Sequence, residues 1–319
     1  MKSKTIIVTG PTATGKTALA VDLARQFTGE IFSADSRQVY KGLDIGTGKD
    51  LEEYCGTKPV PFHLIDIADP MQDFSLFHWR TQFIDAFTDT IEKKSLPIVC
   101  GGTALYLDML LKNYELAGGQ REYREVDFEK MPLENLISKL QQVSPEVYAK
   151  TDLGQKNRVI RALEIASSTA LPQVALPEMD FIVLAPYWHR KTVHARIEQR
   201  LHERWLGMIA ETKLLIDLGV THEKLEWFGL EYRYMSRFLT KQITEKEAFE
   251  QLLIKIRQFA KRQDVWFRKM EKAGTEIHWL TEDDKLQQAC HLVELFTKGE
   301  NLPEPDLKLS ETVYGPRTQ

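Results

Sequence analysis

The 319-residue sequence contains only three cysteines, no hydrophobic run of membrane-spanning length and no low-complexity tract. Cys55, Cys100 and Cys290 are far apart and lack the spacing of a metal site, so we expect free thiols in a reducing cytosol. Met1 to Lys4 leads directly into an apolar segment without the pattern of a signal peptide. We therefore expect a soluble, cytoplasmic protein that makes no membrane contact.

The chain also lacks the excess of positive charge that marks many nucleic-acid-binding domains, because its formal net charge is −4. This total argues only weakly against a nucleic acid, since basic side chains gather locally in the C-terminal half. Apolar residues make up 43% of the sequence, which is enough for a substantial core in one large domain or two smaller ones.

The most informative stretch fits the phosphate-binding pattern G-x-x-x-x-G-K-[ST] at every position. An apolar, β-branched run, Thr5–Thr9, precedes it, and a helical pattern over Ala18–Phe27 follows. A strand that turns into a helix leaves backbone N–H groups unpaired at the helix start, and these bind phosphate oxygens. We expect Lys16 to add a charge for the terminal phosphates and the Thr17 hydroxyl to hold Mg²⁺. The predicted phosphate loop consists of Gly10, Pro11, Thr12, Ala13, Thr14, Gly15, Lys16 and Thr17.

Short apolar strands alternate with helices after this loop. The pattern predicts a strand over Glu30–Asp35, a helix over Phe74–Lys93 capped by Asp73 or Ser75, and a strand over Leu96–Cys100. This alternation is typical of an α/β fold, a P-loop NTPase-like parallel sheet wrapped by helices. Ligands of such sheets bind at the carboxyl ends of the strands, so we expect Asp35, Thr103 and the loop to share one crevice.

The second half of the chain predicts a helical insertion and then a return to the sheet. No strand pattern occurs between Lys112 and about Ser168. Helices are predicted over His189–Gly219, with Val193, Ile197, Leu201, Trp205 and Met208 as its apolar face, and over Thr244–Lys272; strands are predicted over Phe181–Pro186 and Glu276–Leu280. We assign 1–115 and 178–300 to the core, 116–177 to the insertion domain and 301–319 to a poorly ordered tail.

Five motifs in order closely resemble those of the bacterial tRNA dimethylallyltransferases. They are the phosphate loop, Ser33–Tyr40 with Asp44–Thr47, Gly101–Tyr106, Asn157–Glu164 and Ala260–Arg268. The resemblance implies transfer of a dimethylallyl group from dimethylallyl diphosphate to the exocyclic N6 amine of the adenosine 3′-adjacent to the anticodon of tRNA, with release of diphosphate. It also implies the tRNA anticodon stem-loop as a partner, and we expect a monomer.

Two residues are candidates for the chemistry. An adenine amine is a poor nucleophile, so a base must take its proton, and Asp35 at a strand end has the right reach. An Asp in this position is equally often a turn or cap residue, or a magnesium ligand; the resemblance favours a general base. The Thr103 hydroxyl would donate to the bridging oxygen as the bond to carbon breaks, although a Thr after Gly-Gly is more often a helix N-cap.

The departing diphosphate needs a cation besides Lys16. Arg196, Arg200 and Arg204 lie one turn apart on the predicted helix, and the resemblance assigns a diphosphate contact to Arg200, with Arg196 a lesser candidate. The alternative for both is a solvated basic stripe that pairs with Glu198 or Glu203.

The C-terminal helix offers basic side chains interleaved with Phe259, Trp266 and Phe267, a combination that suits RNA phosphates and unstacked bases. The alternative is a solvated charged face with a core aromatic face. From the resemblance we expect tRNA contacts at Asp35, Ser36, Arg37, Gln38, Thr103, Arg124, Asn157, Arg158, Arg161, Lys261, Arg262, Gln263, Trp266 and Arg268.

The sequence departs from the family pattern in places. Leu230 stands after Gly229 where the family usually has Tyr, Phe62-His63 stands where two histidines are common, and the insertion is shorter than in many relatives. Three other functions stay open: a P-loop small-molecule or nucleotide kinase, an enzyme that prenylates free adenine nucleotides, and a nucleotide-responsive RNA-binding module.

Overall fold

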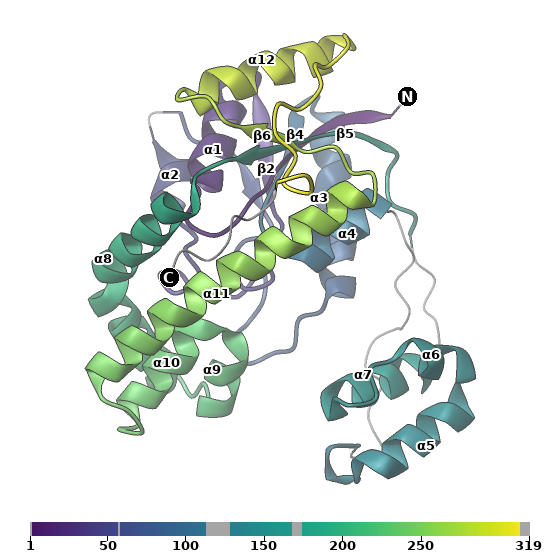
Figure 1. Ribbon diagram of the computed structural model, residues 1–319, viewed down its shortest axis with the longest axis vertical. Coiled ribbons are helices and arrows are strands. Elements are labelled where there is room, and N and C mark those ends of the chain that lie inside the picture. Colours follow the sequence, from purple (N-terminus) through teal and green to yellow (C-terminus); the bar gives the residue numbers. More distant parts are fainter. Residues whose placement is uncertain (1, 57, 113–127, 168–173, 313–319) are drawn as a thin grey trace. The chain divides into compact units, whose positions relative to one another are not determined.

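The computed structural model describes residues 2–56, 58–112, 128–167 and 174–312 (Figure 1). The chain forms two compact units, one of residues 1–112 and 177–319 and the other of residues 113–176. Arg124, a predicted tRNA contact, lies outside the described residues. In the described ranges, no helix combines the length and the apolar character needed to cross a bilayer.

A six-stranded parallel sheet forms the frame of the first unit, with the strand order β3-β2-β4-β1-β5-β6. This α/β architecture confirms the predicted fold class. β3 was not predicted, because two residues are too few for a periodic signal. The strands are β1 (Ser3–Val8), β2 (Gly29–Ser33), β3 (Phe62–His63), β4 (Leu96–Cys100), β5 (Met179–Pro186) and β6 (His278–Leu280).

Helices cover both faces of the sheet (Figure 1). On one face, Ile6 and Val8 of β1 pack in one core cluster with residues of α1 (Lys16–Phe27) and α12 (Lys285–Lys298). On the other face, Phe32 of β2 lies with its ring centroid 5.4 Å from that of Phe83 in α3 (Leu76–Glu92). Ser75 caps α3, as predicted, in a capping box with His78. α2 (Leu51–Cys55) and α4 (Ala104–Lys112) complete the first half of the unit.

A helical layer follows β5 and supplies one wall of the site. Its long members are α8 (Arg190–Asp217) and α11 (Glu245–Lys272), and α9 (His222–Phe228) and α10 (Leu230–Leu239) connect them. The five apolar positions predicted for α8 are all buried against α10 and α11, which confirms that face. Thr244 begins α11 with a capping box to Glu247.

The second unit contains α5 (Leu133–Val143), α6 (Pro145–Lys150) and α7 (Lys156–Ser167), and it has a small core of its own around Leu136, Leu140, Val159 and Leu163. A separate core is what a helical insertion needs to be stable on its own.

The C-terminal segment differs from the expectation of a poorly ordered tail over 301–319. Residues 301–312 are described, and they are fixed by a carboxylate of α11: Glu271 accepts hydrogen bonds from the backbone N–H groups of Leu309 and Ser310. Leu309 is buried. Composition alone predicted disorder, because it contains no signal for a partner 38 residues away in the sequence.

Candidate active site

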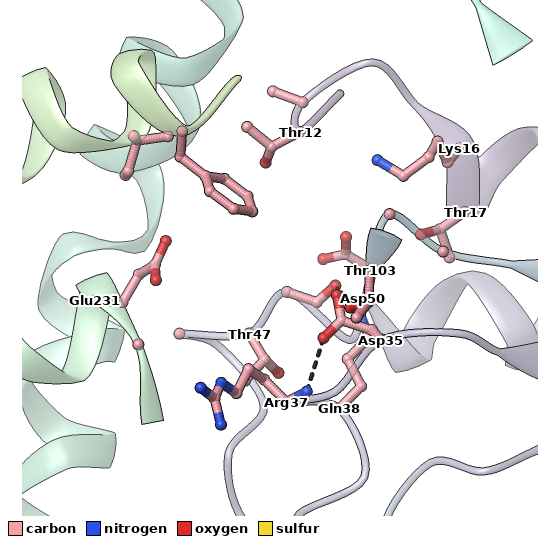
Figure 2. A pocket seen from close by; sticks show the side chains of 18 of the residues that line it. Thr12, Lys16, Thr17, Asp35, Arg37, Gln38, Thr47, Asp50, Thr103 and Glu231 are labelled. Carbon is pink, nitrogen blue, oxygen red and sulfur yellow. Dashed lines mark hydrogen bonds between the residues drawn. The ribbon is translucent and has the colours of Figure 1, made fainter. Parts of the chain in front are cut away.

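A cavity of about 660 Å³ opens where β1, β2 and β4 end, and it lies wholly within the first unit. Figure 2 shows Lys16 and Thr17 of the phosphate loop on one side of it, Asp35 and Thr103 in the middle, and Glu231 of α10 on the opposite side. Three segments distant in sequence therefore converge here, as the strand pattern predicted.

The phosphate loop is held by its carbonyl oxygens. The carbonyl of Pro11 accepts from Lys16 Nζ at 2.7 Å, that of Ala13 from Arg196 Nε at 2.7 Å, and that of Thr14 from Trp188 Nε1 at 3.0 Å. No side chain caps the start of α1, where Gly15 has φ +87°, and its first turn has no acidic residue. The N-terminal N–H groups and the helix dipole are therefore left for an anion.

Gln263 of α11 connects the phosphate loop to the loop after β4. Its Oε1 accepts from the Thr12 N–H at 2.9 Å, and its Nε2 donates to the Gly102 carbonyl at 3.4 Å. The side chain is buried, with 8% exposed. Gln263 was predicted as a tRNA contact. In the structure it hydrogen-bonds two protein loops and fixes them relative to each other.

Lys16 is surrounded by protein on most sides. Burial lowers its pKa from 10.5 to about 8, with a smaller contribution of the same sign from the Arg200 charge. Its ammonium group therefore loses its proton within reach of neutral pH, unless an anion binds beside it.

Asp35 and Thr103 lie next to each other on neighbouring strand ends. One Asp35 carboxylate oxygen accepts from the Arg37 N–H at 2.8 Å, which is a turn bond, and Thr103 Oγ1 accepts from the Ser36 N–H at 3.1 Å. The Thr103 carbonyl begins α4, but its hydroxyl contacts the Asp35 loop and not its own helix. Gly101 permits this approach, because a Cβ there would lie 2.3 Å from the Ala34 carbonyl oxygen.

Arg200 reaches the cavity from α8, where Asp50 holds it at 3.6 Å. Arg204, one turn further along, forms a short ion pair with the same Asp50 carboxylate. Gly48 leaves the space for both guanidinium groups, since a Cβ at this position would lie 1.8 Å from Arg200 Nη2. Arg196 instead binds the phosphate loop, so Arg200 is the one of the two predicted arginines that lines the cavity.

Comparisons with known proteins agree with this geometry. The chain matches the family models described as IPP transferase over residues 38–270 and Isopentenyl transferase over residues 3–61. It is 45% identical over 294 residues to tRNA dimethylallyltransferase 2 of Shewanella sediminis, covering 90% of this chain and 97% of that one. The chain belongs to the IPP transferase family.

Solved structures of the family have the same architecture. The tRNA isopentenylpyrophosphate transferase of Bacillus halodurans is 30% identical, with a TM-score of 0.68 over 93% of this chain and 98% of that chain. A eukaryotic dimethylallyltransferase acting on tRNA shares the fold, with 24% identity and a TM-score of 0.80 over 95% of this chain and 81% of that chain.

The residues predicted to contact tRNA fall into three groups. Asp35, Ser36, Arg37, Gln38, Thr103, Arg262, Gln263 and Trp266 line the cavity. Arg158 and Arg161 are exposed in the second unit, where they pair with Asp152 and Glu164, and Asn157 is exposed beside them. Lys261 is exposed on α11, whereas Arg268 donates to the carbonyl of Thr312 in the C-terminal segment.

Of the three aromatic residues noted on α11, Phe267 fits the alternative of a core residue. It is fully buried and packs edge-on against Trp279 of β6 at a centroid distance of 5.6 Å. Phe259 is 40% exposed and Trp266 is partly exposed, and both line the cavity.

Three acidic residues of the cavity, Asp50, Glu53 and Glu231, were not predicted. Asp50 pairs with Arg200 and Arg204, which lie 150 and 154 residues further along the sequence, and no local pattern indicates this pairing. Glu231 follows Leu230, the position at which the chain departs from the family pattern. Its carboxyl group faces the cavity from the start of α10 (Figure 2).

Proposed function

We propose that this protein transfers the dimethylallyl group of dimethylallyl diphosphate to the N6 amine of the adenosine 3′-adjacent to the anticodon of tRNA. The observation that carries the proposal is that one cavity contains both an uncapped phosphate loop and the Asp35–Thr103 pair. The names of the relatives supply the tRNA and the prenyl group. We also propose that the protein acts as a monomer in the cytoplasm.

The lining of the cavity suits a prenyl donor better than a nucleotide. Ile197, Leu201 and Met208 of α8 and Ile256 and Phe259 of α11 form an apolar wall. Such a wall removes the methyl groups of a dimethylallyl tail from water, at about 25 cal/mol per Å² of buried apolar surface. A kinase site would need polar groups for a ribose and a base in this place.

In the proposed reaction the amine nitrogen attacks C1 of the allyl group, and the bond from C1 to the diphosphate oxygen breaks. Asp35 accepts the proton that leaves N6. Thr103 donates its hydroxyl proton in a hydrogen bond to the bridging oxygen, since its lone pair already accepts from the Ser36 N–H. The free N–H groups of the loop, Lys16 and Arg200 bind the departing diphosphate.

The chain contains a position for Mg²⁺. Thr17 lies at the cavity beside Lys16 (Figure 2), and Mg²⁺ is usually held by one or two protein oxygens, with phosphates and waters as its other ligands. No cluster of three acidic, His or Cys ligands occurs among the described residues. We therefore propose that Thr17 and the diphosphate hold the ion together, and that it neutralises charge on the leaving group.

Asp35→Asn tests the proposal, because an amide oxygen keeps the bond to the Arg37 N–H but takes no proton. We expect purified protein with unmodified tRNA and dimethylallyl diphosphate to form N6-isopentenyladenosine, measured by nucleoside mass spectrometry. The variant should lower the single-turnover rate by about 10²- to 10⁴-fold. Asp85→Asn, exposed on α3, is the matched control. Phosphorylation by ATP without use of the prenyl donor would reject the proposal.

A further inference from the structure

The carboxyl group of Glu231 has no role in the reaction proposed above. It lies in the first turn of α10 and lines the cavity. In the described part of the chain, no cation lies within 4.0 Å of its carboxylate, although the charges of Arg200 and Arg204 act on it. Both arginines pair with Asp50 instead. A half-buried carboxyl group without an ion-pair partner in the described residues, open to a substrate cavity, is suited to bind a ligand.

The direction of the reaction places the purine at this end of the cavity. In a displacement at carbon, the nucleophile approaches from the side opposite to the leaving group. The phosphate loop holds the leaving group at one end, Asp35 and Thr103 lie in the middle, and Glu231 lies at the far end (Figure 2). An adenine whose N6 reaches Asp35 therefore has its ring on the Glu231 side.

We propose that Glu231 binds the Watson–Crick edge of the extruded adenine, with one carboxyl oxygen donating a hydrogen bond to N1 and the other accepting one from the N6 amine. The inference rests on the proposed function and adds the residue that binds the base edge. N6 carries two hydrogens, so Asp35 takes the one that leaves while Glu231 accepts from the one that stays. Guanine has an oxygen in place of the N6 amine, so it offers no amine hydrogen for Asp35 to take.

The surroundings of Glu231 favour the protonated acid that this pairing needs. Burial is the main cause that raises the pKa of its carboxyl group, and the negative charge of Asp35 acts in the same direction. The Glu231 backbone N–H, Arg200 and Arg204 oppose this rise more weakly. Deprotonation at higher pH would remove the donor to N1.

The test is a double-mutant cycle between the protein and the base. Synthetic anticodon stem-loop RNAs carry adenosine or 1-deazaadenosine, which lacks the N1 acceptor, at the target position. We expect the wild type to lose about tenfold or more in kcat/KM on the 1-deaza substrate. Glu231→Leu should lose no more than about twofold between the two substrates, because it has no donor to lose. Glu294→Leu, on α12 and outside the cavity, is the matched control and should discriminate like the wild type.

Glu231→Gln separates base binding from a structural role. The amide keeps both a donor and an acceptor but does not titrate, so Glu231→Gln should recover at neutral pH much of the kcat/KM that Glu231→Leu loses. The ratio of wild-type to Glu231→Gln kcat/KM should fall as the pH rises. The inference is overturned if Glu231→Leu discriminates against 1-deazaadenosine as the wild type does, or if the ratio does not change with pH. A wild type that prenylates neither RNA rejects the proposed function itself.

Discussion

At the scale of single residues, Lys16 stands out because its ammonium group can lose its proton near neutral pH. Its ammonium group donates to a carbonyl of its own loop, and burial holds its pKa at about 8. A lysine in this state is charged below that pH and neutral above it. Lys16 is therefore the loop cation whose attraction for an anion depends on pH in this range.

We expect kcat/KM for dimethylallyl diphosphate to fall as the pH rises through about 8, because this parameter reports the protonation of the enzyme before the donor binds. Lys16→Arg should remove the fall, since guanidinium stays protonated, although its bulkier head group will lower the absolute rate. The measurement is the pH profile of kcat/KM at saturating tRNA between pH 6.5 and 9.5. Identical profiles for the two proteins would contradict the assignment.

At the scale of elements, α11 shows what a sequence can and cannot predict. Its start at Thr244 follows from a capping box and its length from the helical period, and both are confirmed. The period did not separate Phe267, which is buried, from Trp266, which reaches the cavity. Neighbouring residues on a helix point about 100° apart, and only the packing of β6 and the loops decides which aromatic ring stays accessible.

The elements predicted from the sequence also differ from those of the structure in the short segments. β3, α2 and α9 have too few residues for periodicity to distinguish them from loops. The Asp35 and Thr103 positions were predictable because each follows a strand with a clear apolar pattern. Asp50 was not, since it depends on contacts with arginines of α8 far away in the sequence, and Glu231 was not, since only the fold brings the start of α10 to the cavity.

Substitutions at two nearby residues of α11 should raise the KM values of different substrates. Gln263→Leu removes the hydrogen bonds to Thr12 and Gly102, so the KM for dimethylallyl diphosphate should rise about five- to tenfold, equivalent to about 1 to 1.4 kcal/mol. Lys261→Ala removes an exposed charge, so it should raise the KM for tRNA and leave that for the donor unchanged. Steady-state kinetics with each substrate varied in turn distinguish the two. A rise in the tRNA KM alone for Gln263→Leu would show that it contacts RNA.

At the scale of the whole molecule, the chain consists of two units with separate cores and different surface features. The first unit contains the complete sheet and the complete cavity. The second has its own core and exposes basic side chains on α7. The change from a strand–helix alternation to a purely helical pattern predicted this division, because each pattern requires its own buried face.

Replacing Arg158 and Arg161 with Ala should weaken tRNA binding without changing the KM for dimethylallyl diphosphate. The two side chains are 61% and 51% exposed, so the folded unit should tolerate the change. Each lost phosphate contact lowers the dependence of log Kd on log salt concentration by about 0.7 to 0.9, or about 1.5 for the pair. A salt titration of tRNA binding measures this slope, and the double variant Lys93→Ala/Lys298→Ala is the matched control. An unchanged slope would show that these arginines do not touch RNA.

The order in which the ribosome makes this chain gives the topology of the sheet a further consequence. β1 is made early, but on one side its residues 3–8 pair with residues 179–184 of β5, which are made much later. The phosphate loop emerges directly after β1, yet its fixing contacts come from Trp188, Arg196 and Gln263. A nascent or prematurely terminated polypeptide therefore carries an unsupported loop. We therefore expect this loop to bind phosphate groups only after the chain has been made through α11, which supplies Gln263.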